Sequence, residues 1–448
     1  MLVTTRNRNR RRLGAAILFL ALAGPAVAVA AVTQVGPGGA VVSEQAVRIS
    51  PPVGDIVDVY DSGELDASTE ADAAAAARQA GADFTVSQSA SIAMQRIVRG
   101  SSVVQEAPPT LSIPMGTTVF DRDVIGTLMG TDVSAAVSPT SLVMGRRTAD
   151  LRGARAGDVV TLRSAFGADV DFTIGAVLAD EVTGGTELLI TPEGAARLSL
   201  NRKSSVTMWG FDSRAAIDQA LADNGLVSTR IRIRRSWDPF DPDSTLGMAA
   251  TKALLGEFAY RVNSSGSVTQ ETAWQSANLP SGRRSIGIGI RARCHLVVEP
   301  ALQAAFAEIA QRGLSGVFDV GDANAAGGCH NPRFNRLANS ATIGFLSRHS
   351  WAMAIDTNTV GACQGCAPPN FASRPGGCTA VRILRKHGFS WGGNYLTPDG
   401  MHFEYVGEPR DQLPYPSRWC PNIVDGNTLT VEVTQRATLF DGAGLITE

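Results

Sequence analysis

The stretch SRHSWAMAID, residues Ser347–Asp356, carries more information than any other part of this 448-residue chain. Two later segments belong with it: GFSWGG at Gly388–Gly393 and PDGMHFE at Pro398–Glu404. The whole chain has five histidines, and two of them stand in these segments close to carboxylates. Imidazole and carboxylate groups act both as metal ligands and as proton carriers. We therefore expect the chemistry in the last third of the chain.

The spacing of His349 and Asp356 restricts the local backbone. If residues 349–356 formed one helix, the seven-residue separation would place the two side chains roughly 10 Å apart along the axis, too far for one ion. The segment must then bend to bring them together. Ala354 and Ile355 are apolar and suit the start of a buried strand, which predicts a change from loop to strand near Met353.

His349, Asp356 and His402 together provide two imidazoles and one carboxylate. A catalytic zinc ion takes three such protein ligands and keeps one position open for water. Asp399 precedes His402 by three residues, across a Pro-Asp-Gly turn. A tight turn can direct both side chains at one ion, so Asp399 is expected to accept a proton from zinc-bound water. The sequence thus predicts Zn²⁺ as the cofactor.

These segments resemble the M15 peptidase family, the D-alanyl-D-alanine carboxypeptidase or VanY-like group, and within it the branch of phage endolysins that act as L-alanyl-D-glutamate peptidases. The family pattern is Ser-x-His-x-x-Gly-x-Ala-x-Asp, then Gly-Phe-x-Trp-Gly-Gly, then Asp-x-x-His-Phe-Glu. One position departs, because Ala352 stands where the family has glycine. The resemblance covers about residues 295–410. The matching positions are Ser347, His349, Ala354, Asp356, Gly388–Gly393, Asp399, His402, Phe403 and Glu404.

The resemblance implies roles for individual residues. His349, Asp356 and His402 would bind zinc, and Asp399 would be the general base. An arginine shortly before the first histidine contacts substrate and the developing oxyanion in this family, and Arg333 is the best match, with Arg336 as the nearby alternative. Glu404 would contact a zinc ligand on the side away from the ion, or it would be exposed.

The implied activity is that of a zinc metallopeptidase that hydrolyses peptide bonds in the peptidoglycan stem by zinc-activated water. Trimming of a terminal D-alanine and cleavage of the L-alanyl-D-glutamate bond both stay open. The implied partner is peptidoglycan peptide. The formal net charge of −2 gives no indication of nucleic-acid binding, and the sequence leaves the oligomeric state undetermined.

The N-terminus predicts export. Five arginines between Arg6 and Arg12 precede an apolar stretch from Leu13 to about Val32, which ends in small residues. That order is typical of a secretory signal peptide, whereas about 20 apolar residues could also stay as a membrane anchor. With either reading for residues 1–32, the rest of the chain is extracytoplasmic, secreted or attached through residues 13–32 to the outer face of the cytoplasmic membrane.

All six cysteines lie between Cys294 and Cys420. An even number in an exported chain predicts disulfides, and six cysteines allow fifteen pairings, among which the sequence does not choose. The alternative is a structural zinc ribbon built from Cys363, Cys366, Cys378 and Cys420.

The predicted fold is α+β. A β-rich extracytoplasmic domain of unknown role (33–245) is followed by a helix and linker (246–285). The M15-like domain (286–423) comes next and is expected to have a small antiparallel sheet flanked by helices. A tail (424–448) without an assigned role ends the chain. The stretch Met144–Leu162 also resembles, without any chemical motif, the extracytoplasmic domains of MacB-like transporter components. Strands are expected at 158–162, 172–177 and 229–234, and helices at 71–81, at 246–261, from Pro300 onward and at 379–387, with Thr379 as N-cap; Ser264–Ser267 reads as the linker.

Three other functions compete with the peptidase. An M15-like domain could bind wall peptide without cutting it, and the N-terminal half could make the chain a scaffold in an envelope complex. A serine hydrolase would need Ser-x-x-Lys, which the chain lacks, or a nucleophile elbow, which Gly388–Gly392 spells around Ser390. That elbow needs a strand before the serine and a helix after it, whereas the sequence predicts a helix before Ser390 and a Gly-Gly turn after it.

Overall fold

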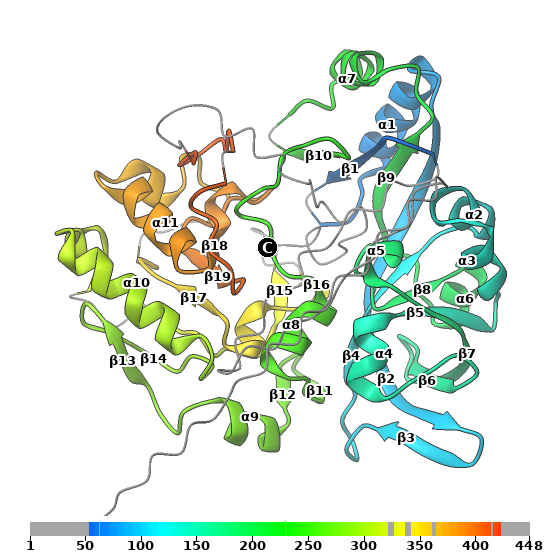
Figure 1. The fold of residues 1–448 in the computed structure, drawn as a ribbon, viewed down its shortest axis with the longest axis horizontal. Helices are drawn as coiled ribbons and strands as arrows, with labels where there is room; N and C mark the ends of the chain where they lie inside the picture. Colours follow the sequence, from blue (N-terminus) through cyan, green and yellow to red (C-terminus); the bar gives the residue numbers. More distant parts are fainter. Residues whose placement is uncertain are drawn as a thin grey trace, which may run out of the picture. The chain divides into compact units, whose positions relative to one another are not determined.

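The computed structural model describes residues 53–61, 63–228, 230–320, 327–336, 342–360, 364–413 and 415–422. The predicted signal or anchor and the C-terminal tail lie outside these ranges. Among the helices within them, none is long and apolar enough to cross a bilayer. The described chain mixes helices and sheets, as the sequence predicts (Figure 1).

The N-terminal part is built on a ten-stranded sheet. Strands β2, β4, β8, β5, β7 and β6 neighbour one another in that order, and β6 pairs again with β2, which closes a six-stranded barrel. Strands β9, β1 and β10 extend the sheet from β2, and β3 pairs with β2 outside this path. The strands are β1 Ile56–Asp61, β2 Asp83–Arg99, β3 Ser102–Glu106, β4 Ile113–Val119, β5 Ser141–Gly145, β6 Val159–Arg163, β7 Asp169–Leu178, β8 Leu188–Ile190, β9 Lys203–Trp209 and β10 Ile231–Arg235.

The length of β2 makes the closure feasible. This 17-residue strand pairs with β9 through its first part, with β4 through its middle and with β6 through Ala93–Val98. Inside the barrel, apolar side chains are fully buried, among them Met94, Leu142 and Phe172. The strands predicted at 158–162 and 172–177 are confirmed as β6 and part of β7. The strand predicted at 229–234 is found as β10, with Thr229 outside the described residues.

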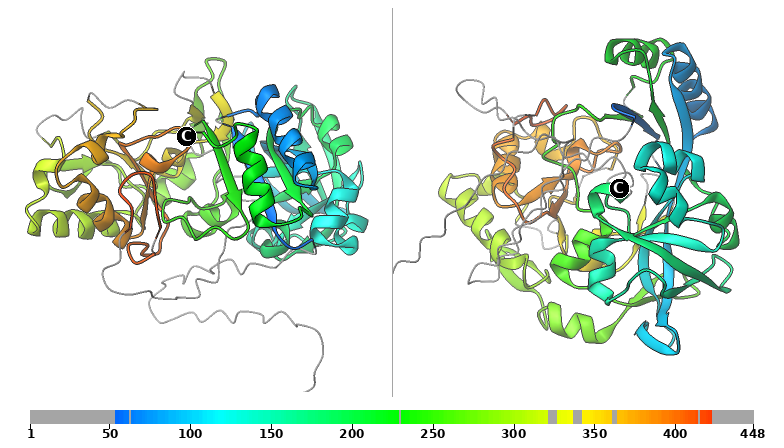
Figure 2. Two further views of the ribbon diagram at one scale, coloured as in Figure 1. Left: turned by 90° about the horizontal axis from the view of Figure 1, so that it is seen from above. Right: turned by 45° about the vertical axis from the view of Figure 1, so that its right-hand side comes forward.

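Two helices cover β1 and β9. Helix α1, Ala67–Gln79, and helix α7, Arg214–Asp223, pack against each other and against a core that includes Val59 and Val206 (Figures 1 and 2). The side chain of Asp66 caps α1, which includes most of the helix predicted at 71–81. The shorter helices around the barrel are α2 Arg122–Met129, α3 Thr131–Ala136, α4 Arg146–Arg152, α5 Asp180–Thr183 and α6 Pro192–Arg197.

The C-terminal part centres on a three-stranded antiparallel sheet in the order β17-β19-β18. Helix α11 packs on β18, and helix α10 packs on α11. The α-helices of this part are α8 Met248–Leu255, α9 Thr272–Asn278, α10 Glu299–Gln311 and α11 Gly377–Lys386. The strands are β11 Tyr260–Val262, β12 Val268–Gln270, β13 Arg284–Gly287, β14 Ile290–Ala292, β15 Phe334–Arg336, β16 Thr342–Leu346, β17 Ala354–Asp356, β18 Phe389–Trp391 and β19 His402–Tyr405. The 3₁₀ turns are η1 Ser315–Val317, η2 Arg348–Trp351, η3 Asn370–Ser373 and η4 Gly392–Asn394.

Several local predictions need correction. The helix expected at 246–261 ends at Leu255, because Gly256 takes a φ of 81°, and the chain continues into β11. Ser264–Ser267 is the turn of the β11–β12 hairpin, not a linker. Helix α11 begins at Gly377, so Thr379 lies inside it and is not its N-cap. The helix at Pro300 is found as α10, and Leu302, Ala305, Phe306 and Ile309 are buried as predicted.

The segment 246–285 contributes to the C-terminal core. Leu255, Phe258, Tyr260 and Trp274 are buried in one cluster with the apolar side chains of α10, α11 and the three-stranded sheet. The indole of Trp351, inside the informative motif, donates to the carbonyl of Gly256 at 3.2 Å. This segment is therefore packed into the same hydrophobic core as the motif.

The cysteines form disulfides. Cys294 is bonded to Cys329, and Cys378 to Cys420; Cys366 is disulfide-bonded as well. A zinc ribbon on Cys363, Cys366, Cys378 and Cys420 is excluded, because a thiolate ligand cannot at the same time be half of a disulfide.

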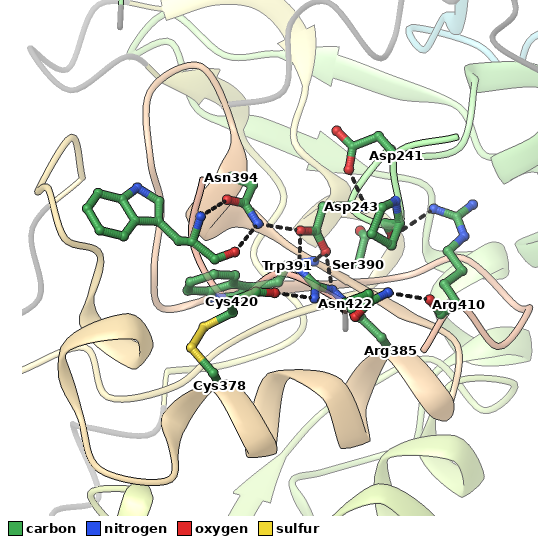
Figure 3. A network of polar contacts seen from close by, with 12 residues as sticks. Asp241, Asp243, Cys378, Arg385, Ser390, Trp391, Asn394, Arg410, Cys420 and Asn422 are labelled. Carbon is green, nitrogen blue, oxygen red and sulfur yellow. Dashed lines mark hydrogen bonds and ion pairs between the residues drawn. A yellow bond between two sulfur atoms is a disulfide. The ribbon is translucent and has the colours of Figure 1, made fainter. Parts of the chain in front are cut away.

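A buried polar network joins the segment before α8 to the C-terminal sheet (Figure 3). Asp243 accepts from Arg385 Nε at 2.8 Å, from the main-chain N–H of Trp391 at 3.0 Å and from the Asn394 amide at 2.7 Å. Arg385 also donates to the carbonyl of Cys420 at 2.7 Å. The side chains of Asp243 and Arg385 are each 1% exposed, so the two charges compensate each other away from water.

Candidate metal centre

The first motif bends where the sequence predicts. Residues Arg348–Trp351 form the 3₁₀ turn η2, which the side chain of Ser347 caps by accepting from the N–H of His349. Ala352 then takes a φ of 52°, and Ala354 starts β17. A left-handed residue at this point explains why glycine is the residue expected there. The bend turns the chain between His349 and Asp356, so that both can face one point.

The second and third motifs form β18 and β19, the other two strands of the sheet that contains β17. β18 and β19 are antiparallel neighbours, and β17 pairs with β19 in a register that sets Asp356 directly opposite His402. Directly opposed residues of an antiparallel pair lie about 4.5–5.5 Å apart. The pairing therefore brings together two residues that are 46 positions apart in the chain.

The three predicted ligands converge. Asp356 Oδ1 lies 3.1 Å from His349 Nε2 and 3.0 Å from His402 Nδ1, and one ligand atom from each of the three residues falls within 4.8 Å of the others. Both imidazoles are buried, whereas 23% of the Asp356 side chain is exposed. The group is thus accessible on the side of the carboxylate.

The electrostatics of this cluster favour a charged Asp356. Burial opposes ionisation, but the charge of His349 and the hydrogen bonds from His349 and His402 outweigh it and hold the pKa of the carboxyl well below its usual range. Asp356 is therefore an anion at neutral pH, the form that a metal ligand needs.

Neighbouring groups decide which ring nitrogen of each histidine faces the cluster. His349 Nδ1 is 2.9 Å from the carbonyl oxygen of Cys329, which can only accept, so Nδ1 carries a proton and donates to this carbonyl, and Nε2 is the nitrogen that faces Asp356. His402 presents Nδ1 to Asp356, and its Nε2 lies 3.6 Å from Glu404 Oε2. Such partners behind the ring orient a metal-binding imidazole.

This donor set fits zinc. Two imidazole nitrogens and one carboxylate oxygen form a ligand set of catalytic zinc sites, and soft sulfur ligands are not required. His349, Asp356 and His402 would hold the ion.

Arg348 is a residue of this centre that the sequence reasoning missed. Its Nε lies 3.1 Å from Glu404 Oε1, and the side chains are 7% and 1% exposed. It also donates to Thr251 Oγ1 at 3.2 Å and to the carbonyl of Leu246. Glu404 is thus buried rather than exposed. The position of Arg348 next to His349 was a weak signal, because the motif allows any residue there.

Asp399 and Arg333 are placed by their main chains. The N–H of Asp399 donates to the carbonyl of Gly392 at 2.8 Å, and the carbonyl of Asp399 accepts from the N–H of His402 at 3.2 Å. Asp399 is 6% exposed. The carbonyl of Arg333 accepts from the N–H of Ser347 at 2.9 Å, and its guanidinium, partly buried, donates to the carbonyl of Phe334 at 3.4 Å. Asp399 stands three residues before His402 in the chain, whereas Arg333 is bonded through its main chain to Ser347, two residues before His349.

Other candidates take structural roles. Ser390 is fully buried in β18, follows a helix rather than a strand, and donates to the carbonyl of Glu404, so no nucleophile elbow exists there. Trp351 and Trp391 are fully buried core residues.

The three histidines outside the centre contact other groups. His295 contacts the carbonyl of Leu255 at 3.0 Å. Of the two remaining histidines, His387 contacts Glu308 at 2.8 Å, and His330 lies between Arg293 and Gln270.

Comparisons with known proteins agree with the C-terminal motifs. Residues 340–405 match the model of an M15 peptidase family described as D-alanyl-D-alanine carboxypeptidase, and this stretch includes His349, Asp356, Asp399 and His402. The match supports a peptidase of the M15 family over that segment. No curated protein matches the chain.

Among solved structures, the chain is similar to the extracellular domain of the noncanonic ABC-type transporter YknZ from Gram-positive bacteria. The identity is 14%, the TM-score is 0.25, and the similarity covers 40% of this chain and 99% of that one. A similarity at this level supports no conclusion about fold or function.

Proposed function

We propose that this chain is an exported zinc metallopeptidase that hydrolyses peptide bonds in the peptide stem of peptidoglycan. The observation that carries the proposal is the convergence of His349, Asp356 and His402, whose ligand atoms lie within 4.8 Å of one another. The family match at 340–405 supports the substrate class. The activity is that of a D,D-carboxypeptidase or of an L-alanyl-D-glutamate endopeptidase.

When bound, zinc would lower the pKa of a water molecule toward ~7 and polarise the substrate carbonyl. Asp399 would act as the general base, which takes the proton of the attacking water and returns it to the leaving amine. Its two main-chain hydrogen bonds support this role, because one ties the base to the turn at Gly392 and the other ties it to His402, the candidate ligand at the start of β19.

Arg333 would stabilise the negative charge that develops on the carbonyl oxygen. Preorganised cationic or N–H donors at such a position contribute strongly to catalysis. The backbone of Arg333 is bonded to Ser347 and to the hydroxyl of Ser350, on both sides of His349. Disulfides between Cys294 and Cys329 and between Cys378 and Cys420 support an extracytoplasmic location.

The test is zinc content and muropeptide cleavage by the purified full-length protein. We expect about one zinc per chain by elemental analysis, and mass spectrometry of the products identifies the bond that is cut. His402→Ala should lose both zinc and activity, whereas Asp399→Asn should keep zinc and lose at least ~100-fold in rate.

Matched controls are His387→Ala and Asp411→Asn, which change a histidine and a buried aspartate outside the centre. Both should bind zinc and cleave like the wild type. A folded wild-type protein that binds no zinc and cuts no muropeptide would refute the proposal and favour a wall-binding or scaffold role.

A further inference from the structure

The segment 327–336 lies against the bend that carries two of the three ligands. Its main chain is bonded to that bend at several points: the N–H of Asn331 donates to the carbonyl of His349 at 3.1 Å, and Ser347 donates to the carbonyl of Arg333 at 2.9 Å. The hydroxyl of Ser350 also donates to this carbonyl, at 3.2 Å. We call residues 327–336 the support segment.

The most direct contact runs through Cys329. Its carbonyl oxygen accepts from His349 Nδ1 at 2.9 Å, and Cys329 is fully buried. This hydrogen bond holds a proton on Nδ1 and directs Nε2 at the cluster. The position of one backbone carbonyl therefore sets both the orientation and the available nitrogen of His349.

The start of the support segment meets the second ligand. A Cβ atom placed on Gly327 would lie 2.8 Å from Asp356 Cβ and 3.0 Å from the carbonyl oxygen of Asp356. Real side chains do not tolerate such contacts, so only glycine lets the segment approach this closely. At the adjacent Gly328, in contrast, a Cβ would meet nothing within 4 Å.

The disulfide ties this segment to a second stretch of chain that contacts the same bend. Cys294, which is 1% exposed, is bonded to Cys329, and the N–H of the next residue, His295, donates to the carbonyl of Ala352 at 3.0 Å. Ala352 is the left-handed residue between His349 and Asp356. The covalent link thus holds the two stretches of chain that contact the bend from His349 to Ala352.

We propose that the Cys294–Cys329 disulfide and the support segment position the metal ligands His349 and Asp356, so that oxidation of this cysteine pair sets the affinity for the metal. The inference rests on the proposed function for the identity of the ion. Changes to groups that orient metal ligands lower metal affinity by about 10–100-fold. We expect a loss of that size when the link is removed.

The test compares two pairs of substitutions in the full-length protein. Cys294→Ser/Cys329→Ser removes the link to the centre, and Cys378→Ser/Cys420→Ser removes a disulfide that contacts none of the three ligands in the described contacts. Zinc affinity is measured by competition with a chelator. We expect a loss of about 10–100-fold for the first pair and less than about threefold for the second. Equal affinities of the two folded variants would overturn the inference.

A second measurement reports on His349 without zinc. In protein labelled with ¹⁵N-histidine, the Nδ1–H proton of His349 is assigned by comparison with His349→Gln. In the wild type and in the Cys378/Cys420 variant, we expect this proton to exchange slowly with water, because Cys329 accepts it in a buried position. It should exchange fast in Cys294→Ser/Cys329→Ser. Slow exchange in that variant would contradict a positioning role.

If the Cys294→Ser/Cys329→Ser variant does not fold, substitutions of Gly327 and Gly328 test the inference instead. Gly327→Ala pushes the support segment away from Asp356 with the disulfide intact, whereas Gly328→Ala has free space. We expect a loss of zinc affinity in Gly327→Ala alone, and wild-type affinity in that variant would overturn the inference. If the wild type itself binds no zinc, the proposed function fails, while the exchange of the Nδ1–H proton still tests the positioning.

Discussion

At the scale of single residues, the guanidinium of Arg348 is buried against the carboxylate of Glu404, which in turn lies behind the ring of His402. A charge removed from water is tolerated only when it is paired and hydrogen-bonded. Arg348 meets this requirement through Glu404, Thr251 and the carbonyl of Leu246. Arg348, the residue between Ser347 and His349, therefore holds the carboxylate that lies 3.6 Å from the ring of His402.

Arg348→Met should destabilise the protein by about 3–5 kcal/mol, because Glu404 is then left buried without its counter-charge. Arg348→Met/Glu404→Gln should recover much of this loss, since neither charge remains. Urea unfolding of the wild type, the two single variants and the double variant gives the coupling energy. Strictly additive effects would show that the two side chains do not act as a pair.

At the scale of elements, helices α10 and α11 are joined by Glu308. Its carboxylate lies 2.9 Å from Lys386 Nζ and 2.8 Å from His387 Nε2, and Arg312 of the following turn also contacts it. Hydrogen bonding from Lys386 first, and from His387 and Arg312 after it, outweighs partial burial and lowers the pKa of Glu308 to about 2.

This pKa predicts an acid-sensitive contact between the two helices. The ordinary pKa of the carboxyl is 4.5, so the stabilisation is complete above that pH and is lost as the pH falls from about 4.5 to about 2. Glu308→Gln should therefore lower stability at pH 6 and have little effect near pH 2. Unfolding in urea across this range, with the exposed Glu106→Gln as control, checks the prediction. A difference between wild type and Glu308→Gln that does not vary with pH would contradict it.

At the scale of the whole described chain, buried ion pairs link segments that are distant in sequence. Lys252 of α8 pairs with Glu187 beside the barrel strand β8 at 2.9 Å, and both side chains are fully buried. Asp243 pairs with Arg385 of α11. The stretch from Asp243 to α8 thus contacts the barrel on one side and the C-terminal sheet on the other. A fragment that began at residue 286 would lack Asp243 and would leave Arg385 without its buried counter-charge.

Arg385→Met should loosen the C-terminal sheet while the barrel stays intact. Breaking a buried pair from one side costs about 3–5 kcal/mol, and here Asp243 would remain buried with its charge. Hydrogen exchange should increase in α11, β18 and β19 but not in β4 and β8. Arg382→Met on the same helix, where the side chain is only partly buried, is the control. Equal protection in wild type and Arg385→Met would contradict this role.

The sequence predicted what depends on neighbours along the chain. The bend between His349 and Asp356, the strand start at Ala354 and the buried face of α10 follow from spacing and apolar pattern, because these are properties of a few consecutive residues. The helix predicted at 246–261 was too long, because one glycine with a positive φ outweighs the helical spacing of the residues beyond it.

Contacts between distant residues were decided by the tertiary structure alone. The closure of the barrel by β2 and β6, the choice of Cys329 as partner of Cys294, the burial of Arg348 on Glu404 and the approach of Gly327 to Asp356 all join positions that no local pattern relates. The candidate ligands His349, Asp356 and His402 could be proposed from their residue types, because zinc chemistry restricts those types. The groups that orient them could not, because a backbone carbonyl or a buried ion pair can come from any residue that the fold brings within reach.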